Sequence, residues 1–488
     1  MKLKEIISRI EPVQVIGSTD VEITDVVADS RQVKKGALFV AVKGVAVDAH
    51  RFIPAVIEAG AAAVLCQEVP ESPAAHVTYV VVADSSAALA WVAGDWYDRP
   101  SEKLRLVGIT GTNGKTTTAT LLHRLVQQLG YKAGLLSTVK NVIDRREEEA
   151  KQTTPDHLTL NRLLHEMVKA GCDYAFMEVS SHACVQHRID GLTFAGAVFT
   201  NLTQDHLDFH KTMDEYLKAK KSFFDGLPAS AFALVNVDDR NGMVMLQNCA
   251  ATKRTYALRS MADYRCCVIE ERIDGMSLQI NGRDVEVLLT GHFNAYNLTA
   301  IAATTMMLGF DADEVLVALS RLQSADGRFQ TLRAPAGYTA IVDYAHTPDA
   351  LINVLDTIND LLRQGHKDAQ VITVCGCGGN RDATKRPIMA HEAAKRSHKL
   401  VLTSDNPRFE RPEAILADME AGLTPEDRAH TITITDRRQA IATACLLARR
   451  GDVVLVAGKG HETYQEVEGV KHHFDDREVL RRCFSTPS

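Results

Sequence analysis

The segment Gly111-Thr-Asn-Gly-Lys-Thr-Thr117 constrains the possible folds of this chain more than any other feature. It follows the apolar run 104–109, which predicts a buried strand, and it precedes apolar residues at helical spacing up to Gly130. A strand, a glycine-rich turn and a helix in this order direct backbone N–H groups and the positive end of the helix dipole at one point. Lys115 adds a cation for the outer phosphates, and the Thr116 hydroxyl can ligate Mg²⁺. The strict phosphate-loop pattern has glycine at position 109, where this chain has isoleucine. The alternative to a phosphate loop is therefore a glycine turn that precedes a lysine by chance. We expect a phosphate loop that binds ATP or a related nucleotide.

Length and charge exclude several classes of protein. A chain of 488 residues predicts about three domains. Its net charge of −7 argues against general nucleic-acid binding, and no run approaches the roughly 20 apolar residues of a membrane helix. The charged start, residues 1–10, is no signal peptide. We therefore expect a cytoplasmic protein whose cysteines are reduced and mostly buried; Cys375-Gly-Cys377 lacks a second pair for a zinc site.

Short apolar runs alternate with helical patterns over most of the chain, which predicts an α/β protein with mostly parallel sheets and helices on both faces. Polar breaks at 97–103 and 324–330 suggest three domains, 1–100, 101–332 and 333–488. Expected strands are 22–27, 37–42, 62–66, 104–109, 174–179, 196–200, 232–237, 371–375, 399–403 and 452–457. Ligands of such sheets bind at the carboxyl ends of the strands.

Chemically suggestive residues follow several of these runs. Glu178 ends one strand and could either ligate Mg²⁺ or cap the next helix. The stretch 200–210 holds two Asp and two His close together, which favours a metal or phosphate role over a solvated turn. The lysine-rich segment 216–224, taken alone, is better explained as a solvated helix face. Three cationic turns at 376–387, 405–408 and 458–462 predict an anionic ligand at one sheet edge.

Together these motifs resemble the Mur ligase family of bacterial cell-wall synthesis, from about Asp29 to Glu478. The nine matching motifs, in the family's order, are GTNGKTT (111–117), EVSSHA (178–183), NLTQDHLDFH (201–210), YLKAK (216–220), GHFNAYN (291–297), DYAHTPDAL (343–351), GCGGNRDATKRP (376–387), DNPR (405–408) and GKGHE (458–462). The resemblance implies a UDP-substrate domain, a central P-loop ATPase-type domain and a C-terminal Rossmann-like domain. It also implies an ATP-dependent amide ligase that extends UDP-N-acetylmuramoyl-L-alanyl-D-glutamate through an acyl phosphate.

The resemblance further implies roles for individual residues. Expected catalytic residues are Lys115, Glu178, His206 and Lys220. Expected Mg²⁺ ligands are Thr116, Glu178, His206 and Lys220, the last as a carbamylated lysine (N6-carboxylysine). Expected ATP contacts are Gly111, Thr112, Asn113, Gly114, Lys115, Thr116, Thr117, Asn297, Arg328, Asp343 and Tyr344. Expected contacts to the UDP-muramoyl dipeptide are Ser30, Thr153, Thr154, Ser181, Gln186 and Arg188.

The amino acid to be added is expected to be meso-2,6-diaminopimelate, with L-lysine as the alternative. The implied contacts are Arg381, Asp405, Asn406, Pro407, Arg408, Gly458 and Glu462. Diaminopimelate carries a second carboxylate that the fork of Arg408 can bind, whereas lysine would leave a buried guanidinium unpaired. Rejection of a ligand that lacks a required polar group can reach about 10⁴- to 10⁵-fold.

Two other functions compete with this interpretation. A folylpolyglutamate synthetase shares the central design but is not expected to carry the DNPR and GKGHE turns or a UDP-binding domain. A switch-type NTPase would turn over nucleotide without an amino-acid substrate. We expect a monomer with small-molecule substrates, no nucleic-acid partner and no membrane insertion.

Overall fold

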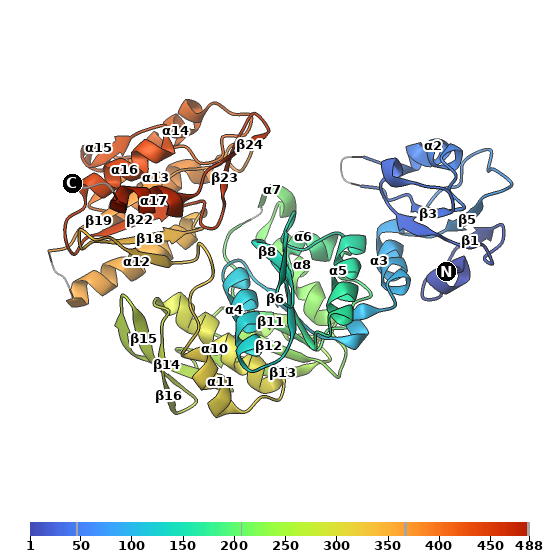
Figure 1. Ribbon diagram of the computed structural model, residues 1–488, viewed down its shortest axis with the longest axis horizontal. Helices are drawn as coiled ribbons and strands as arrows, with labels where there is room; N and C mark the ends of the chain where they lie inside the picture. The colour runs from blue at the N-terminus through green and yellow to red at the C-terminus, as the bar shows by residue number, and fades with distance from the viewer. Residues whose placement is uncertain (45–46, 206, 366–367, 486–488) are drawn as a thin grey trace. The chain divides into compact units, whose positions relative to one another are not determined.

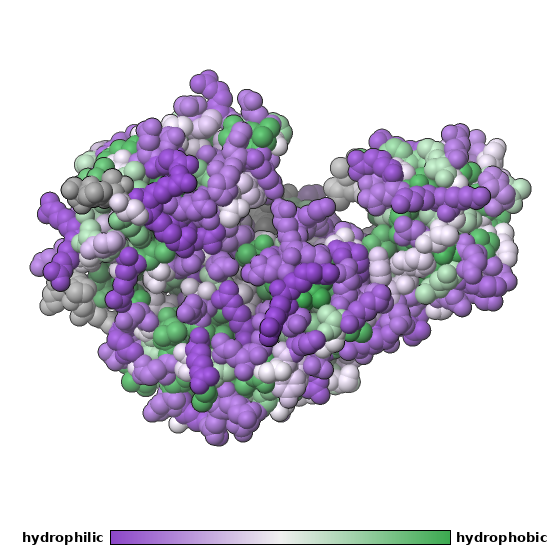
Figure 2. Space-filling model, viewed as in Figure 1, coloured by the Kyte–Doolittle hydropathy of each residue, from purple (hydrophilic) through white to green (hydrophobic). Residues whose placement is uncertain are grey.

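The computed structural model describes residues 1–44, 47–205, 207–365 and 368–485 (Figure 1). The chain divides into two compact units, each described by itself below. The first comprises Met1–Gly111, Leu122–Phe199 and Asp214–Thr255, and the second comprises Thr112–Leu121, Thr200–Met213 and Tyr256–Ser488. On the face shown in Figure 2, hydrophilic residues predominate.

The first unit begins with a five-stranded sheet of order β1-β5-β4-β3-β2, drawn in blue in Figure 1. Its strands are β1 (Gln14–Ile16), β2 (Asp25–Val27), β3 (Ala37–Val40), β4 (Ala63–Cys66) and β5 (Thr78–Val81). All neighbours are parallel except β1 and β5. Helices α1 (Leu3–Ile6) and α3 (Ser85–Trp96) share a core with one face of the sheet, and α2 (Ile53–Glu58) shares a core with the other.

The central sheet of the first unit has the order β12-β11-β6-β10-β7-β8-β9. Its strands are β6 (Arg105–Thr110), β7 (Ala133–Leu136), β8 (Lys140–Ile143), β9 (Arg146–Glu149), β10 (Tyr174–Glu178), β11 (Gly196–Phe199) and β12 (Phe232–Asn236). The strands from β12 to β7 are parallel, as predicted, whereas β8 and β9 add an antiparallel edge that we did not predict. The helices of this unit that follow its strands are α5 (His157–Lys169), α6 (Ser181–Val185), α8 (Met213–Asp225) and α9 (Gly242–Met245). Helix α4 (Lys115–Gln128) begins in the second unit and ends in the first, and α7 (Leu207–His210) belongs to the second unit.

An antiparallel meander lies in the second unit and was also not predicted. It consists of β14 (Tyr264–Arg272), β15 (Gly275–Ile280) and β16 (Arg283–Val287), and the end of β13 (Thr252–Ala257) pairs with the start of β14. Helices α10 (His292–Met307) and α11 (Ala312–Leu319) follow, and α10 contacts β14 while α11 contacts β16. Helix α10 is buried over most of its length, from Asn294 onward.

The last sheet, in the second unit, has the order β17-β18-β22-β19-β20-β21. Its strands are β17 (Gln330–Arg333), β18 (Thr339–Asp343), β19 (Val371–Cys375), β20 (Lys399–Leu402), β21 (Thr431–Thr433) and β22 (Val453–Ala457). All but β17 are parallel, so the carboxyl ends of β22, β19 and β20 are adjacent, as predicted.

Helices cover both faces of this sheet, as expected for the doubly wound class. One core joins it to α12 (Pro348–Gly365), α13 (Lys385–Arg396) and α14 (Pro412–Glu420). The other core joins it to α16 (Arg437–Leu447) and α17 (Asp476–Ser485). The remaining elements are η1 (Ser30–Gln32), η2 (Ala49–Phe52), η3 (Pro100–Lys103), α15 (Pro425–Ala429) and the hairpin β23 (Tyr464–Val467) to β24 (Val470–His473).

Candidate active site

The turn before α4 has the backbone that a phosphate loop requires. Gly114 has a φ of +88°, a left-handed conformation that costs a residue with a Cβ free energy. A Cβ at this position would also lie 2.5 Å from Oδ1 of Asn297, which comes from α10. Asn297 is buried and accepts a hydrogen bond from the Thr118 hydroxyl at 3.5 Å. The predicted contact residue Asn297 therefore lies directly against the loop.

Thr200 and Asn201, at the start of the motif 201–210, form hydrogen bonds with the phosphate loop. The Thr112 amide donates to the Asn201 carbonyl at 2.8 Å, and the Asn113 amide donates to Oδ1 of Asn201 at 2.9 Å. The Thr200 hydroxyl donates to the Asn113 carbonyl at 2.6 Å. The Lys115 ammonium donates to the Thr112 carbonyl at 2.9 Å. These bonds hold the loop in shape, while His206 of the same motif lies outside the described residues.

Arg328 reaches the start of α4. Its Nη2 donates to the Thr116 hydroxyl at 3.1 Å, and its guanidinium lies 4.6 Å from the ring centroid of Tyr344. Its Nε is buried and has no hydrogen-bond partner among the described residues. Asp343, beside Tyr344, accepts from the amides of Phe329 and Ala345 at 2.6 and 2.7 Å. Burial raises the pKa of Asp343, although Arg328 opposes the shift. Four of the expected ATP contacts thus lie together: Thr116, Arg328, Asp343 and Tyr344.

Glu178 ends β10 in the first unit and is 1% exposed. Its Oε1 accepts from the Thr138 amide at 2.8 Å, whereas its Oε2 is buried without a hydrogen-bond partner among the described residues. The side chain that caps α6 is Ser180, which accepts from the Ala183 amide, so the alternative of Glu178 as the cap is wrong. A buried carboxylate oxygen without a donor fits a ligand of a hard cation such as Mg²⁺.

Lys220 on α8 is buried, with 1% of its surface exposed. Its Nζ donates to the Gly111 carbonyl at 2.8 Å and lies 4.6 Å from the ring centroid of Tyr216. The interpretation of this segment as a wholly solvated face is therefore wrong at Lys220, although Lys218 on the same helix is exposed. The amine is held beside the first residue of the phosphate loop.

Four of the residues expected at the dipeptide form one hydrogen-bonded group in the first unit. Arg188 donates from Nη1 to the Thr154 carbonyl at 2.7 Å and from Nη2 to Oε1 of Gln186 at 2.5 Å. The Thr153 hydroxyl accepts from the Thr138 hydroxyl at 3.0 Å, and the Thr154 hydroxyl donates to the Glu178 carbonyl at 2.7 Å. Through the Thr154 hydroxyl, this group adjoins Glu178 at the end of β10.

The other two residues expected to contact the dipeptide, Ser30 and Ser181, each begin a helix in the first unit. Ser181 is buried and is the first residue of α6. Ser30 begins η1 after β2, and Asp29 caps η1 by accepting from the Arg31 amide at 3.0 Å. Hydrogen bonds from Arg31 hold the pKa of Asp29 below its usual range. Ser30 therefore belongs to the N-terminal sheet rather than to the group around Arg188.

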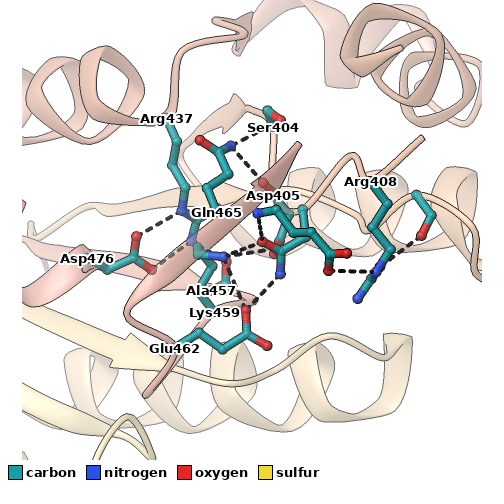
Figure 3. A network of polar contacts seen from close by, with 12 residues as sticks. Ser404, Asp405, Arg408, Arg437, Ala457, Lys459, Glu462, Gln465 and Asp476 are labelled. Atoms are coloured by element: carbon teal, nitrogen blue, oxygen red, sulfur yellow. Dashed lines mark hydrogen bonds and ion pairs between the residues drawn. The ribbon is translucent and has the colours of Figure 1, made fainter. Parts of the chain in front are cut away.

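A buried lysine organises the carboxyl ends of β20 and β22 (Figure 3). Lys459 has no exposed surface, and its Nζ donates to Oδ1 of Asn406 at 2.9 Å and to Oε2 of Glu462 at 3.1 Å. The same Nζ lies 3.6 Å from Oδ1 of Asp405. The GKGHE and DNPR turns thus meet around one ammonium, which we did not predict as a site residue.

Charge and close packing shape this cluster. Gly458 has a φ of +114°, and a Cβ on it would lie 2.6 Å from Oδ2 of Asp405. Burial would raise the pKa of Asp405, but Lys459 and Arg437 outweigh burial and hold that pKa below its usual range. Burial and the neighbouring Asp405 raise the pKa of Glu462. The cluster therefore couples two carboxyl groups to one fixed cation.

Arg437 and Asp476 support this edge from within the core and were missed from the sequence. Both side chains have no exposed surface; Nε and Nη2 of Arg437 each donate to one carboxylate oxygen of Asp476 at 2.8 Å. Nη2 also donates to the carbonyl of Ala457, the last residue of β22, at 3.0 Å. Asp476 raises the pKa of Arg437 against the opposing effect of burial. Neither residue belongs to a short motif, so no local pattern could have indicated the pair.

Arg408, the expected specificity residue, has partners within the chain. Its Nη1 donates to the Gly379 carbonyl at 2.8 Å, and its Nε lies 3.4 Å from Oε2 of Glu466. The argument that lysine would leave this guanidinium unpaired is therefore wrong for the protein without ligand, because Glu466 supplies a carboxylate. Pro407 is buried, and its carbonyl accepts from the Glu410 amide. Arg381 is exposed, and no side-chain hydrogen bond or ion pair is recorded for it among the described residues.

Among the described residues, no group of three or more His, Cys, Asp or Glu side chains is arranged to hold a metal ion. Across the helices that the structure describes, none is both long and apolar enough to span a membrane. All ten cysteines lie in the described ranges as free thiols, seven of them buried.

The sequence matches family models over most of its length. Residues 22–97 match the Mur ligase family, catalytic domain; residues 109–305 match the Mur ligase middle domain; and residues 327–460 match the Mur ligase, glutamate ligase domain. The chain belongs to the Mur ligase family.

Individual relatives share one name. The chain is 56% identical to UDP-N-acetylmuramoyl-L-alanyl-D-glutamate--2,6-diaminopimelate ligase of Parabacteroides distasonis, over 100% of this chain and 99% of the relative. It is 56% identical to the ligase of the same name from Bacteroides fragilis, over 99% of each chain. A solved structure of a ligase with that name superposes with a TM-score of 0.69 at 33% identity, covering 99% of this chain and 98% of the other.

Proposed function

We propose that this chain is the ATP-dependent ligase that adds meso-2,6-diaminopimelate to UDP-N-acetylmuramoyl-L-alanyl-D-glutamate in peptidoglycan synthesis. Full-length identity of 56% to ligases of that name supports the reaction. The observation that carries the choice of amino acid is the cluster of Asp405, Asn406 and Glu462 around Lys459. Arg408 follows Asn406 in the same turn and pairs with Glu466, so cationic and anionic groups occur together at this sheet edge. Diaminopimelate carries both an ammonium and a carboxylate at its distal end, so both kinds of group can be used.

The reaction needs positive charge where two anions meet. The γ-phosphoryl group of ATP passes to the γ-carboxylate of the D-glutamate, which gives an acyl phosphate and ADP. The incoming amine then attacks the acyl carbon, the amide forms, the amine loses a proton and inorganic phosphate leaves. In our proposal the loop amides and Lys115 bind the phosphates, Asn297 supports the loop, and Arg328 stabilises charge beside Thr116.

Mg²⁺ is the cofactor that we propose, because it neutralises the phosphates and polarises the transferred group. Glu178 fits it through its unpartnered buried Oε2. Lys220 as an unmodified ammonium would repel the cation. Once it has lost a proton, the neutral amine can attack CO₂ and lose a second proton, and the resulting carbamate would be a carboxylate-like ligand. The buried position of Lys220 beside Gly111 supports that modification, because it holds the side chain next to the loop where we propose that the phosphates bind.

Substrate binding divides along the chain in this proposal. Residues 1–100, with Ser30, bind the UDP end; residues 101–332 bind ATP; and residues 333–488 bind the amino acid. The hydrogen-bonded group of Thr153, Thr154, Gln186 and Arg188 binds the dipeptide together with Ser181. We further propose that the protein acts in the cytoplasm as a monomer, where ATP and the UDP-linked substrate are available.

One experiment tests the reaction and its specificity together. ADP release is measured with ATP, Mg²⁺ and UDP-N-acetylmuramoyl-L-alanyl-D-glutamate, with either meso-diaminopimelate or L-lysine as the amine. We expect turnover with diaminopimelate and at least about a hundredfold lower kcat/KM with lysine, since a hydrogen-bonding group is lost. Equal turnover with lysine would contradict the assigned specificity, and ADP release without any amino acid would favour a plain NTPase.

A further inference from the structure

Arg408 shares its guanidinium with a carboxylate of its own chain. Nε of Arg408 lies 3.4 Å from Oε2 of Glu466, and the two side chains are 22% and 23% exposed. Nη1 of Arg408 donates to the Gly379 carbonyl at 2.8 Å. Both partners approach Arg408 at the edge where the cluster around Lys459 lies. The ion pair is therefore part of the amino-acid site, not a remote surface contact.

The backbone fixes Glu466 in this place. The Arg408 amide donates to the Glu466 carbonyl at 3.0 Å, and the Glu468 amide donates to the Arg408 carbonyl at 2.7 Å. The Glu466 amide donates to Oδ1 of Asn406 at 3.0 Å. The hairpin of β23 and β24 is thus bonded to the DNPR turn on both sides of Glu466. A change of the side chain at this position leaves these three backbone bonds available.

Another cation near Glu466 is already engaged. Lys471 is paired opposite Glu466 on β24, and its Nζ lies 4.2 Å from the ring centroid of Tyr464. The Lys471 ammonium thus lies over the ring of Tyr464, whereas Glu466 forms its ion pair with Arg408. The charge of Glu466 therefore acts mainly on Arg408.

The geometry of a guanidinium explains why this matters. A carboxylate binds best with both oxygens on two parallel N–H groups of one edge of the fork, either Nε with Nη2 or Nη1 with Nη2. Glu466 pairs with Nε and the Gly379 carbonyl accepts a hydrogen bond from Nη1, so each edge of the Arg408 guanidinium already has one partner. A carboxylate that enters as a bidentate ligand must displace one of these partners, and next to Glu466 it also meets a like charge.

We propose that Glu466 is a placeholder carboxylate, which competes with the distal carboxylate of the incoming amino acid for Arg408 and so sets how strongly the site selects a dicarboxylate. This inference rests on the proposed function. Glu466 weakens the binding of diaminopimelate, because the substrate must share or take over Arg408. It also reduces the penalty for an amino acid without a distal carboxylate, because Arg408 keeps its partner.

The substitution Glu466→Gln tests this role, since it removes the charge and keeps the size and the backbone bonds. We expect the KM for meso-diaminopimelate to fall roughly two- to fivefold, the range given by a partly exposed ion pair, with the KM for ATP unchanged. Glu468→Gln is the matched control, because Glu468 lies in the same hairpin and is exposed. It should leave both KM values unchanged.

The outcomes separate this inference from the proposed function. If the unsubstituted protein ligates diaminopimelate and Glu466→Gln leaves its KM unchanged or raises it, Glu466 does not compete and the inference fails alone. An equal fall in KM with Glu468→Gln would attribute the effect to net charge and would also overturn it. If the unsubstituted protein does not ligate diaminopimelate, the proposed function and the inference fail together.

Discussion

The substitution Gly114→Ala tests the phosphate loop through two separate effects. At a φ of +88°, a Cβ costs about 1–2 kcal/mol whatever surrounds it. At Gly114 the Cβ would additionally lie 2.5 Å from Oδ1 of Asn297, so either the loop or α10 must move. A shift that removes one N–H bond to a charged phosphate costs about 1.5–3 kcal/mol, which is roughly a 10- to 150-fold loss of affinity.

Gly130 provides the matched control just beyond the other end of the same helix. Its φ is +91°, but no atom lies within 4 Å of an added Cβ. Gly130→Ala should therefore lose about the same 1–2 kcal/mol of stability without any change in nucleotide binding. The assay is the KM for ATP in the ligation reaction, with thermal unfolding of both variants alongside. Equal KM values in the two variants would refute the contact between the loop and Asn297 as a determinant of ATP binding.

Three further predictions concern a modification, the core and pH. Lys220→Ala should lose at least about a hundredfold in kcat and regain part of it with added short carboxylic acids, whereas the exposed Lys218→Ala should keep full activity; a fully active Lys220→Ala would exclude the carbamate. Asp476→Asn leaves the buried Arg437 without its counter-ion and should lower the free energy of unfolding, measured with denaturant, by about 3–5 kcal/mol. A decrease below about 1 kcal/mol would contradict the description of a buried ion pair. Burial lowers the pKa of His123 from 6.5 to about 4, so the unfolded chain binds a proton at a higher pH than the folded chain does. The free energy of unfolding should therefore fall as the pH drops from about 6.5 to 4, by up to about 3 kcal/mol for this residue. The unfolding midpoint measured across this range should fall less steeply in His123→Gln, and an unchanged slope would refute the assignment.

Many strands with continuous apolar runs could be predicted closely from the sequence. The run 371–375 is β19 to the residue, and the other predicted strands have cores that match, with ends that differ by a few residues. Three short buried apolar strands, β5, β7 and β18, are absent from the predicted set. Other missed strands are amphipathic or charged: β9 reads Arg-Glu-Glu-Glu, β14 has a single buried position, and β16 alternates exposed and buried positions near its end. Such strands are defined by their pairing partners, which a local pattern does not contain.

The site shows the same division between local and long-range information. Gly114 and Lys115 belong to a motif whose spacing alone predicts a phosphate loop, and the structure gives Gly114 the backbone that this motif requires. Lys220 could be singled out only through the family, because its burial depends on how α8 packs. The partners of Arg408 and Arg437 lie 58 and 39 residues away along the chain, and no short pattern links them. Tertiary contacts therefore decide which charged residues of a motif are paired.

The acyl-phosphate ligation itself can be tested most directly with ¹⁸O in the γ-carboxylate of the D-glutamate residue. Mass spectrometry of both products follows one turnover with ATP, Mg²⁺ and meso-diaminopimelate. The account predicts one ¹⁸O atom in the inorganic phosphate. It also predicts a UDP-linked product whose mass is that of the substrate plus diaminopimelate minus one water, with the oxygen of that water being the ¹⁸O that left with the phosphate. Unlabelled phosphate together with an unchanged nucleotide substrate would contradict it, because ATP would then be hydrolysed without activating the carboxylate.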